Sequence, residues 1–168
     1  MSKKSKFVPG ALAFGILGAF ATANAQPRCF TAASLQGSYA VVANYGANVA
    51  ISIGTRTFDG KGNLTGSFTI NEPTPGSTTG DRTIVTGTQT GTYTVNCDGT
   101  GSVTRTLKAS NGVTATVMDD FVITGAVVGF YSQFLATSVV DAQRTPAAIV
   151  PGGIFLTRTY TRLPSPTQ

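Results

Sequence analysis

From Ser38 onward, the chain is a series of short runs rich in Val, Ile, Thr, Tyr and Phe, separated by Gly, Asn, Asp and Pro. No long segment of this part has the apolar repeat of about 3.6 residues that an amphipathic helix requires. Short runs of β-branched and aromatic residues between turn residues are typical of an all-β sandwich or barrel. The pattern therefore predicts an all-β protein.

We predict eight or nine antiparallel strands, joined mainly by tight turns. Closing such a sheet removes its exposed edges, so the predicted architecture is an up-and-down barrel. The segments 83–88 and 91–95 are either two strands or one bent strand, and the strand 113–123 contains a bulge near Asp119 and ends at the turn Thr124-Gly125. The other predicted strands are 38–45, 49–58, 64–70, 101–108, 127–139 and 154–162.

Two of the turns repeat one pattern, D-G-x-G followed by an apolar residue and Thr, at 59–65 and 98–104. Asp-Gly supplies a turn with positive φ, and the second Gly permits a bulge at the mouth of a hairpin. The alternative is calcium binding, but calcium takes six to eight oxygen ligands and each turn offers one carboxylate. We therefore read both as hairpin turns and predict no metal site.

The N-terminus has the order of a bacterial secretory signal peptide. Three lysines lie within residues 1–6, an uncharged apolar run spans 7–23, and Ala23-Asn24-Ala25 ends it with small residues. A retained membrane anchor is the alternative, but Pro9 and several glycines weaken this run as a permanent helix. We predict cleavage after Ala25, which leaves 26–168 as a single secreted or periplasmic domain without stable membrane insertion.

The domain that remains after cleavage has nine basic and seven acidic residues, and the basic ones are scattered. Nucleic acid is therefore not an expected partner. Cys29 and Cys97 are the only cysteines, and in an exported chain they predict one disulfide. The alternative, a redox or nucleophilic thiol, lacks both the C-x-x-C spacing and a histidine.

Three segments carry a resemblance to a known kind of protein. They are Leu35-Gln36-Gly37-Ser38-Tyr39, the hairpin at 57–66 and the hairpin at 91–101. Together, over residues 35–125, they resemble a family of small exported bacterial β-barrel proteins of uncharacterised function, with the general shape of lipocalins and avidins. The lipocalin G-x-W motif is absent because the chain has no Trp. The resemblance implies a barrel and carries no functional residue with it.

The residue types exclude several kinds of chemistry. The chain has no histidine, so a Ser-His-Asp or Cys-His mechanism and zinc sites built on histidine are excluded. No phosphate-binding or dinucleotide fingerprint occurs, and no cofactor is expected. Asp119 and Asp120 are the only adjacent carboxylates, and neighbours on a strand point to opposite faces. They form a facing pair only if a bulge intervenes.

Arg105 and Arg158 each stand in phase with apolar residues of a predicted strand. If these faces point inward, two guanidinium groups enter the barrel, and Asp119 or Asp120 could neutralise them. Alternatively, the arginines bind an anionic ligand group such as a carboxylate. In the third interpretation both faces point outward and the Arg stems cover apolar surface. The residues in phase with the arginines are Val103, Leu107, Leu156 and Tyr160, and Phe155 competes with Leu156 for the interior.

Apolar alternation continues through 128–136, which predicts that Val128, Phe130, Ser132, Phe134 and Ala136 line the interior. An eight-stranded barrel is either filled by side chains or holds one small ligand. The sequence is compatible with both.

Three functions follow from these observations. The first is an exported non-enzymatic barrel that binds a small apolar or amphipathic ligand, with Arg105, Arg158, Asp120, Phe130 and Phe134 as candidate ligand-binding residues. An open apolar cavity would support it, and a barrel packed solid with side chains would rule it out. The second is a structural or adhesive module of the envelope, for which an unpaired edge strand would be evidence. The third is an isomerase-like or cyclase-like enzyme, which needs the two arginines, Asp120 and a tyrosine in one pocket.

Overall fold

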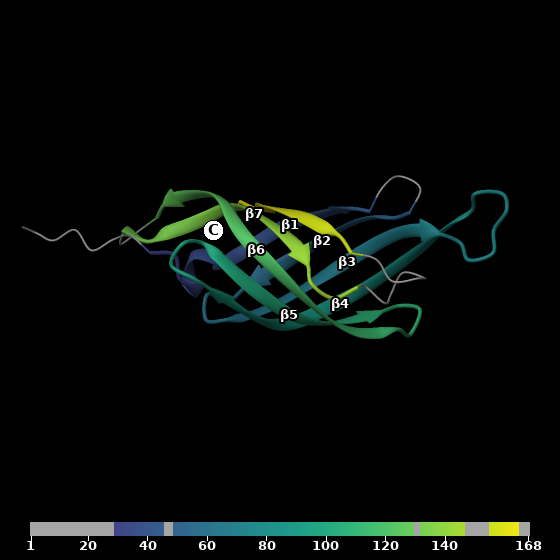
Figure 1. Ribbon diagram of the computed structural model, residues 1–168, viewed down its shortest axis with the longest axis horizontal. Helices are drawn as coiled ribbons and strands as arrows, with labels where there is room; N and C mark the ends of the chain where they lie inside the picture. The colour runs from purple at the N-terminus through teal and green to yellow at the C-terminus, as the bar shows by residue number, and fades with distance from the viewer. Residues whose placement is uncertain (1–28, 46–48, 130–131, 147–154, 165–168) are drawn as a thin grey trace, which may run out of the picture.

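The fold is a closed barrel of eight antiparallel strands, in which each strand pairs with the next and the last pairs with the first (Figure 1). The computed structural model describes residues 29–45, 49–129, 132–146 and 155–164. A short 3₁₀ helix, η1 (Ala32–Leu35), precedes the barrel. The strands are β1 (Gly37–Asn44), β2 (Ile51–Phe58), β3 (Asn63–Pro73), β4 (Arg82–Val95), β5 (Thr100–Ala109), β6 (Thr114–Val128), β7 (Phe134–Gln143) and β8 (Thr157–Arg162).

The predicted all-β up-and-down barrel is thus confirmed, with eight strands. Of the two alternatives for 83–95, the structure has one continuous strand, β4. Within the described ranges, no helix is long and apolar enough to cross a membrane. The predicted signal peptide and its cleavage site lie outside the described residues.

The prediction for the segment after Asp119 is wrong. No turn forms at Thr124-Gly125, because β6 continues to Val128 and the pairing with β7 shifts its register between Ile123 and Ala126. This irregularity absorbs the residues that the sequence analysis assigned to a turn, and the expected bulge lies here rather than near Asp119.

The interior lining predicted for 128–136 is wrong for the same reason, since the segment crosses the β6–β7 connection and is not one strand. Val128 is 53% exposed and Ser132 is also exposed, whereas Ala136 is fully buried. Phe130 lies outside the described residues.

Both D-G-x-G segments form hairpin turns, as predicted. The Asp59 carboxylate accepts hydrogen bonds from the backbone N–H groups of Lys61 (2.7 Å) and Asn63 (2.9 Å), and Gly60 and Gly62 have φ of 77° and 105°. The hydrogen bonds from the Asn63 side chain and backbone and from Lys61 lower the pKa of Asp59 to about 2. Each carboxylate is therefore occupied in holding its own turn.

Helix η1 covers one end of the barrel, which we call the closed end. It packs against β4 and β7, two strands on different sides of the barrel, and Leu35 is 1% exposed. The Phe58 ring meets the rings of Tyr39 and Tyr93 edge-on, with centroids 5.5 Å and 5.0 Å apart. This apolar cluster comprises Leu35, Tyr39, Val41, Phe58, Leu64, Tyr93, Val103, Phe121, Ala136, Val139 and Tyr160.

Arg162, near the end of β8, ties the closed end together. Its guanidinium donates to the backbone oxygens of Ala136 and Gln36, both at 2.6 Å, and lies over the Tyr39 ring, 4.9 Å from the centroid. The last strand is thus joined to the first strand and to the residue that follows η1.

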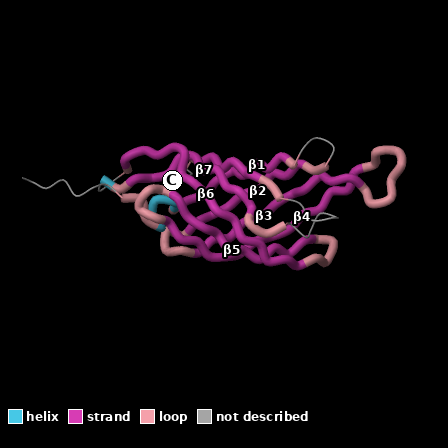
Figure 2. The backbone as a smooth tube through the Cα atoms, viewed as in Figure 1, coloured by secondary structure: helices cyan, strands magenta, loops and turns pink. Residues whose placement is uncertain are grey.

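The opposite end, which we call the distal end, carries the β1–β2, β3–β4, β5–β6 and β7–β8 connections. The β3–β4 connection extends beyond the barrel there, away from η1 (Figure 2). A second apolar cluster fills this half of the interior, formed by Ala43, Ala50, Phe68, Ile70, Val85, Leu107, Val117 and Leu156.

The predicted disulfide is present. Cys29 and Cys97 are bonded, with Cα atoms 4.5 Å apart, and the link joins the segment before η1 to the β4–β5 turn. The backbone N–H of Phe30 also donates to the Cys97 oxygen at 3.1 Å. The covalent bond therefore fixes the chain that covers the closed end.

We expect the double variant Cys29→Ser/Cys97→Ser to remain a barrel with a lower free energy of unfolding. The bond closes a loop across a sequence separation of 68, and chain entropy then predicts a loss of about 4 kcal/mol. Urea unfolding followed by circular dichroism measures the difference. Dithiothreitol should destabilise the native protein by the same amount and leave the variant unchanged, and equal sensitivity of both proteins would contradict the assignment.

Candidate functional site

Five charged side chains meet inside the middle of the barrel, between the two apolar clusters. We call them the charged belt. Each comes from a different strand and is at most 7% exposed. Alternation places them inside, because each stands two residues from a buried neighbour on its own strand. The belt consists of Arg56 on β2, Arg105 on β5, Asp119 on β6, Asp141 on β7 and Arg158 on β8.

The belt is a chain of alternating charges. Arg105 donates to both oxygens of Asp119, at 2.6 Å from Nε and 3.2 Å from Nη2. Arg158 Nη1 bridges the two carboxylates, 3.0 Å from Asp119 Oδ1 and 2.8 Å from Asp141 Oδ2. Arg56 Nη1 reaches the same Asp141 oxygen at 3.3 Å. The paired hydrogen bonds from one guanidinium to both oxygens of a carboxylate, as between Arg105 and Asp119, are among the strongest between side chains.

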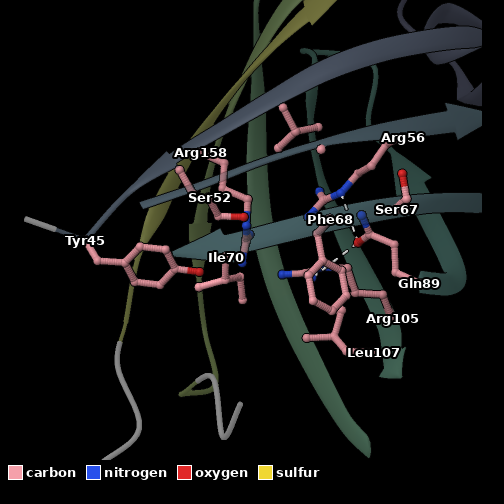
Figure 3. Close-up of a pocket in the computed structure, with 13 residues that line it drawn as sticks. Tyr45, Ser52, Arg56, Ser67, Phe68, Ile70, Gln89, Arg105, Leu107 and Arg158 are labelled. Carbon is pink, nitrogen blue, oxygen red and sulfur yellow. Dashed lines mark hydrogen bonds between the residues drawn. The ribbon is translucent and has the colours of Figure 1, made fainter. Parts of the chain in front are cut away.

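Neutral groups complete the belt. Gln89 Oε1 accepts from Arg56 Nε and Arg105 Nη1, both at 3.3 Å, as the dashed lines in Figure 3 show. Gln143 Oε1 accepts from Arg158 at 2.9 Å, and the Tyr160 hydroxyl donates to Asp141. These partners satisfy buried donors without adding charge, so the belt keeps three guanidinium groups against two carboxylates.

The two carboxylates have opposite pKa shifts. Burial alone would raise the pKa of Asp119, but the hydrogen bond from Arg105 and the nearby guanidinium charges hold it at about 2. Burial raises the pKa of Asp141, against the effect of Arg158 and Arg56. Burial also lowers the pKa of Arg56 well below its usual range, and the charges of Arg105 and Arg158 lower it further. Arg56 is therefore the belt cation in the least favourable field.

Glycines facing the interior make room for the large polar side chains. Gly91 pairs with Arg105 across β4 and β5, and a Cβ at this glycine would lie 2.7 Å from the Arg105 Cα atom. Gly66 pairs with Arg56, and a Cβ there would lie 3.1 Å from Gln89 Nε2. Any larger residue at these positions would push against the belt.

A cavity of about 30 Å³ lies on the distal side of the belt (Figure 3). Arg56, Arg105, Arg158 and Gln89 contribute to its polar lining, and Tyr45 also borders it. Its apolar lining comes from Val41, Ala43, Phe68, Ile70 and Leu107. This volume holds about two water molecules, whereas pockets for drug-sized ligands measure roughly 300–1,000 Å³. Side chains therefore fill most of the barrel.

The structure separates the two predicted arginines from the predicted Asp120. Arg105 and Arg158 face inward, and their carboxylate partner is Asp119. Asp120 lies on the outer face, with its side chain 51% exposed, and pairs with Arg144 at 2.5 Å. The enzyme hypothesis required Asp120 beside the two arginines, and this constellation does not form.

The predicted aromatic site residues do not join the arginines either. Phe134 begins β7 at the closed end, with its ring 5.1 Å from that of Phe30, and the position of Phe130 is outside the described residues. The competition on β8 is decided in favour of Leu156, which is 6% exposed, whereas Phe155 is 66% exposed.

The sequence analysis missed Arg56 and Asp141. Arg56 stands in phase with Phe58, which is the same signal that selected Arg105 and Arg158. Asp141 stands in phase with Val139, but it lies beyond the predicted strand 127–139, whereas β7 continues to Gln143. The alternation rule selects Arg56 on the predicted strand 49–58, whereas it selects Asp141 only if the predicted strand 127–139 is extended by two residues.

Comparison with known proteins adds no identity, since no family, curated protein or solved structure matches the chain. Among the residues that the structure describes, no group of three or more acidic, histidine or cysteine side chains could hold a metal ion.

Asp119 and Asp120 provide a matched pair of substitutions one residue apart. Asp119→Asn removes the partner of two buried arginines and should lower the free energy of unfolding by about 3 kcal/mol or more. Asp120→Asn breaks an exposed ion pair and should cost about 1 kcal/mol or less. Chemical unfolding of both variants checks the difference, and equal losses would show that the faces of β6 are assigned wrongly.

Protonation of Asp119 should contribute to the loss of folding stability at acid pH. Its pKa in the folded protein is about 2, below the ordinary value of 3.8. The carboxylate therefore contributes stability that is present above about pH 4 and is lost as the pH falls through about 2. Carbon-detected NMR of side-chain carboxyl groups should give a midpoint near 2 for Asp119 and a midpoint above the ordinary value for Asp141. An Asp119 midpoint at 4 or higher would contradict the hydrogen-bonded belt.

Proposed function

We propose that this protein is an exported, non-enzymatic barrel that binds one small amphipathic ligand at its distal end. The observation that carries the proposal is the cavity on the distal side of the belt, whose lining combines three guanidinium groups and a few neutral polar side chains with apolar side chains. In binding sites, a few convergent polar groups orient the ligand and apolar walls supply most of the contact.

A second hollow next to the cavity supports an amphipathic ligand. It measures about 320 Å³ and includes the exposed ring of Phe155 together with Leu156. Tyr45 lines both spaces. In the proposal, the polar end of the ligand enters toward the three arginines that line the cavity, and its apolar part lies against Tyr45 and Phe155. Neither Asp120 nor Phe134 takes part, because both lie elsewhere.

A wholly apolar ligand inside the barrel has less support. The interior cavity is too small for one, and guanidinium groups at its inner end would lose water without gaining a partner. Export is supported by the signal-like order of residues 1–25 and by the disulfide, since such bonds persist in oxidising compartments.

The second candidate is an interaction module of the envelope, and the outer surface favours it. Val42 and Ile53 are directly paired across β1 and β2, are 54% and 64% exposed, and lie close to exposed Ile51 and Ile84. The eight described strands leave no unpaired edge, so a partner would have to contact these side chains rather than add a strand.

Native mass spectrometry of the protein isolated from its own envelope tests ligand binding. We expect one retained small molecule, which denaturing solvent releases. Phe155→Ser should lower its occupancy severalfold, because part of the apolar contact is lost. Val128→Ser removes another exposed apolar side chain, at the closed end, and should have no effect. Bare protein mass in every gentle preparation, with or without added amphiphiles, would contradict the proposal.

A further inference from the structure

The belt holds more positive charge than its own carboxylates neutralise. Arg56, Arg105 and Arg158 face Asp119 and Asp141, so one positive charge is unmatched. The remaining buried carboxylate, Glu72, lies elsewhere. It is six residues along β3 from Gly66, the partner of Arg56, which is about 20 Å of strand.

Glu72 lies toward the distal end of the same interior, because its charge and those of Arg158, Arg105 and Asp141 all influence the pKa of Tyr45. The cation that influences the pKa of Glu72 itself is Arg82, and none of the hydrogen bonds or ion pairs given for the described residues joins Glu72 to the belt. Glu72 therefore makes no direct contact that would neutralise Arg56.

Burial lowers the pKa of Arg56, but arginine stays protonated in proteins, so the protein does not remove this charge by releasing a proton. Protonation of a belt carboxylate would increase the excess positive charge. Burial raises the pKa of Asp141, and a protonated Asp141 would leave two positive charges unmatched instead of one. A buried charge without a counterion is costly, so an anion from outside would relieve it.

The contacts show that Arg56 is where the charge is least neutralised. Arg105 and Arg158 each have two carboxylate contacts, and the shortest are 2.6 Å and 2.8 Å. Arg56 has one, at 3.3 Å, and its other bond goes to the neutral Gln89 at 3.3 Å. Its side chain is 1% exposed and borders the cavity. An anion in the cavity would thus meet the arginine that most needs it.

We propose that the cavity is the site of a singly charged carboxylate head, held by Arg56 at the inner end of the ligand-binding region. This deepens the proposed function and rests on it, since the rest of the same ligand lies at the distal end. A carboxylate carries one negative charge, which equals the excess positive charge of the belt. Its two oxygens would fill a space that holds about two water molecules. They can also accept two parallel hydrogen bonds from one guanidinium group. A dianionic phosphate would exceed both the charge and the space.

Three compounds with one tail and different heads test this assignment. Octanoate, octanol and octyl phosphate carry about one, zero and two negative charges at pH 8. Isothermal titration calorimetry with the wild-type protein should give octanoate at least about a tenfold lower Kd than octanol, as expected for a charged hydrogen bond. Octyl phosphate should bind more weakly than octanoate despite its larger charge.

The variant Arg56→Gln tests whether Arg56 causes the preference for octanoate over octanol, and Arg144→Gln is its control. Arg56→Gln leaves two arginines against two aspartates, so the belt becomes neutral, and the preference for octanoate over octanol should disappear. Arg144→Gln removes an exposed arginine on the outer face and should leave the preference unchanged. If Arg56→Gln fails to fold, the three-compound series on the wild-type protein still decides.

The outcomes separate this inference from the proposed function. Equal binding of octanoate and octanol, or tighter binding of octyl phosphate, would overturn the carboxylate site and leave amphipathic binding standing. Unchanged preference in a folded Arg56→Gln variant would also overturn it. No binding of any compound would overturn the proposed function itself.

Discussion

The contact between Arg105 and Asp119, extended through Arg158 to Asp141, is the constraint on which the interior depends. Taking such ions out of water is costly, and it is tolerated only where each finds several partners in good geometry. Here each of five strands must place one charged side chain at the same level along the barrel axis. A slip of one residue in any pairing would turn that side chain to the outer face and leave its partners buried and unmatched. The belt therefore favours one register of the whole barrel.

The rest of the interior supports the belt from both sides. Toward the closed end, Tyr160 joins the aromatic cluster to Asp141, and η1 with Arg162 covers that end. Toward the distal end, the second apolar cluster surrounds the cavity. Low dielectric on both sides strengthens the ion pairs, and it makes the unmatched charge at Arg56 more costly. The same arrangement that specifies the fold thus creates an attraction for an anion.

The alternation of apolar and polar residues predicted the architecture well, because successive side chains on a strand point to opposite faces of the sheet. The barrel and the D-G-x-G hairpins follow from local patterns, and the disulfide follows from the presence of only two cysteines in a chain expected to be exported. The phase of Arg105 and Arg158 with apolar residues left open whether they face inward. Alternation also decides between Asp119 and Asp120 once the position of one inward neighbour, such as Val117, is known.

Predictions failed where a pattern had two readings. Thr124-Gly125 has turn composition, but a register shift in the β6–β7 pairing absorbs these residues. Phe130 and Phe134 were assigned to one strand face because the β6–β7 connection carries no strong turn dipeptide. The partners within the belt come from strands far apart in sequence. Which belt residues meet across the interior depends on the closure of the barrel by pairing of β8 with β1. No local sequence pattern encodes that closure.

The central claim is that the charged belt carries one more positive charge than its two carboxylates neutralise, and that this excess is least compensated at Arg56, whose single carboxylate contact is 3.3 Å long. Anomalous diffraction from crystals soaked in sodium bromide tests it most directly, because bromide is a small monoanion that can be located without ambiguity. The account predicts a bromide peak inside the cavity, within hydrogen-bonding distance of the Arg56 guanidinium. Bromide confined to the outer surface, with only neutral water beside Arg56, would contradict it.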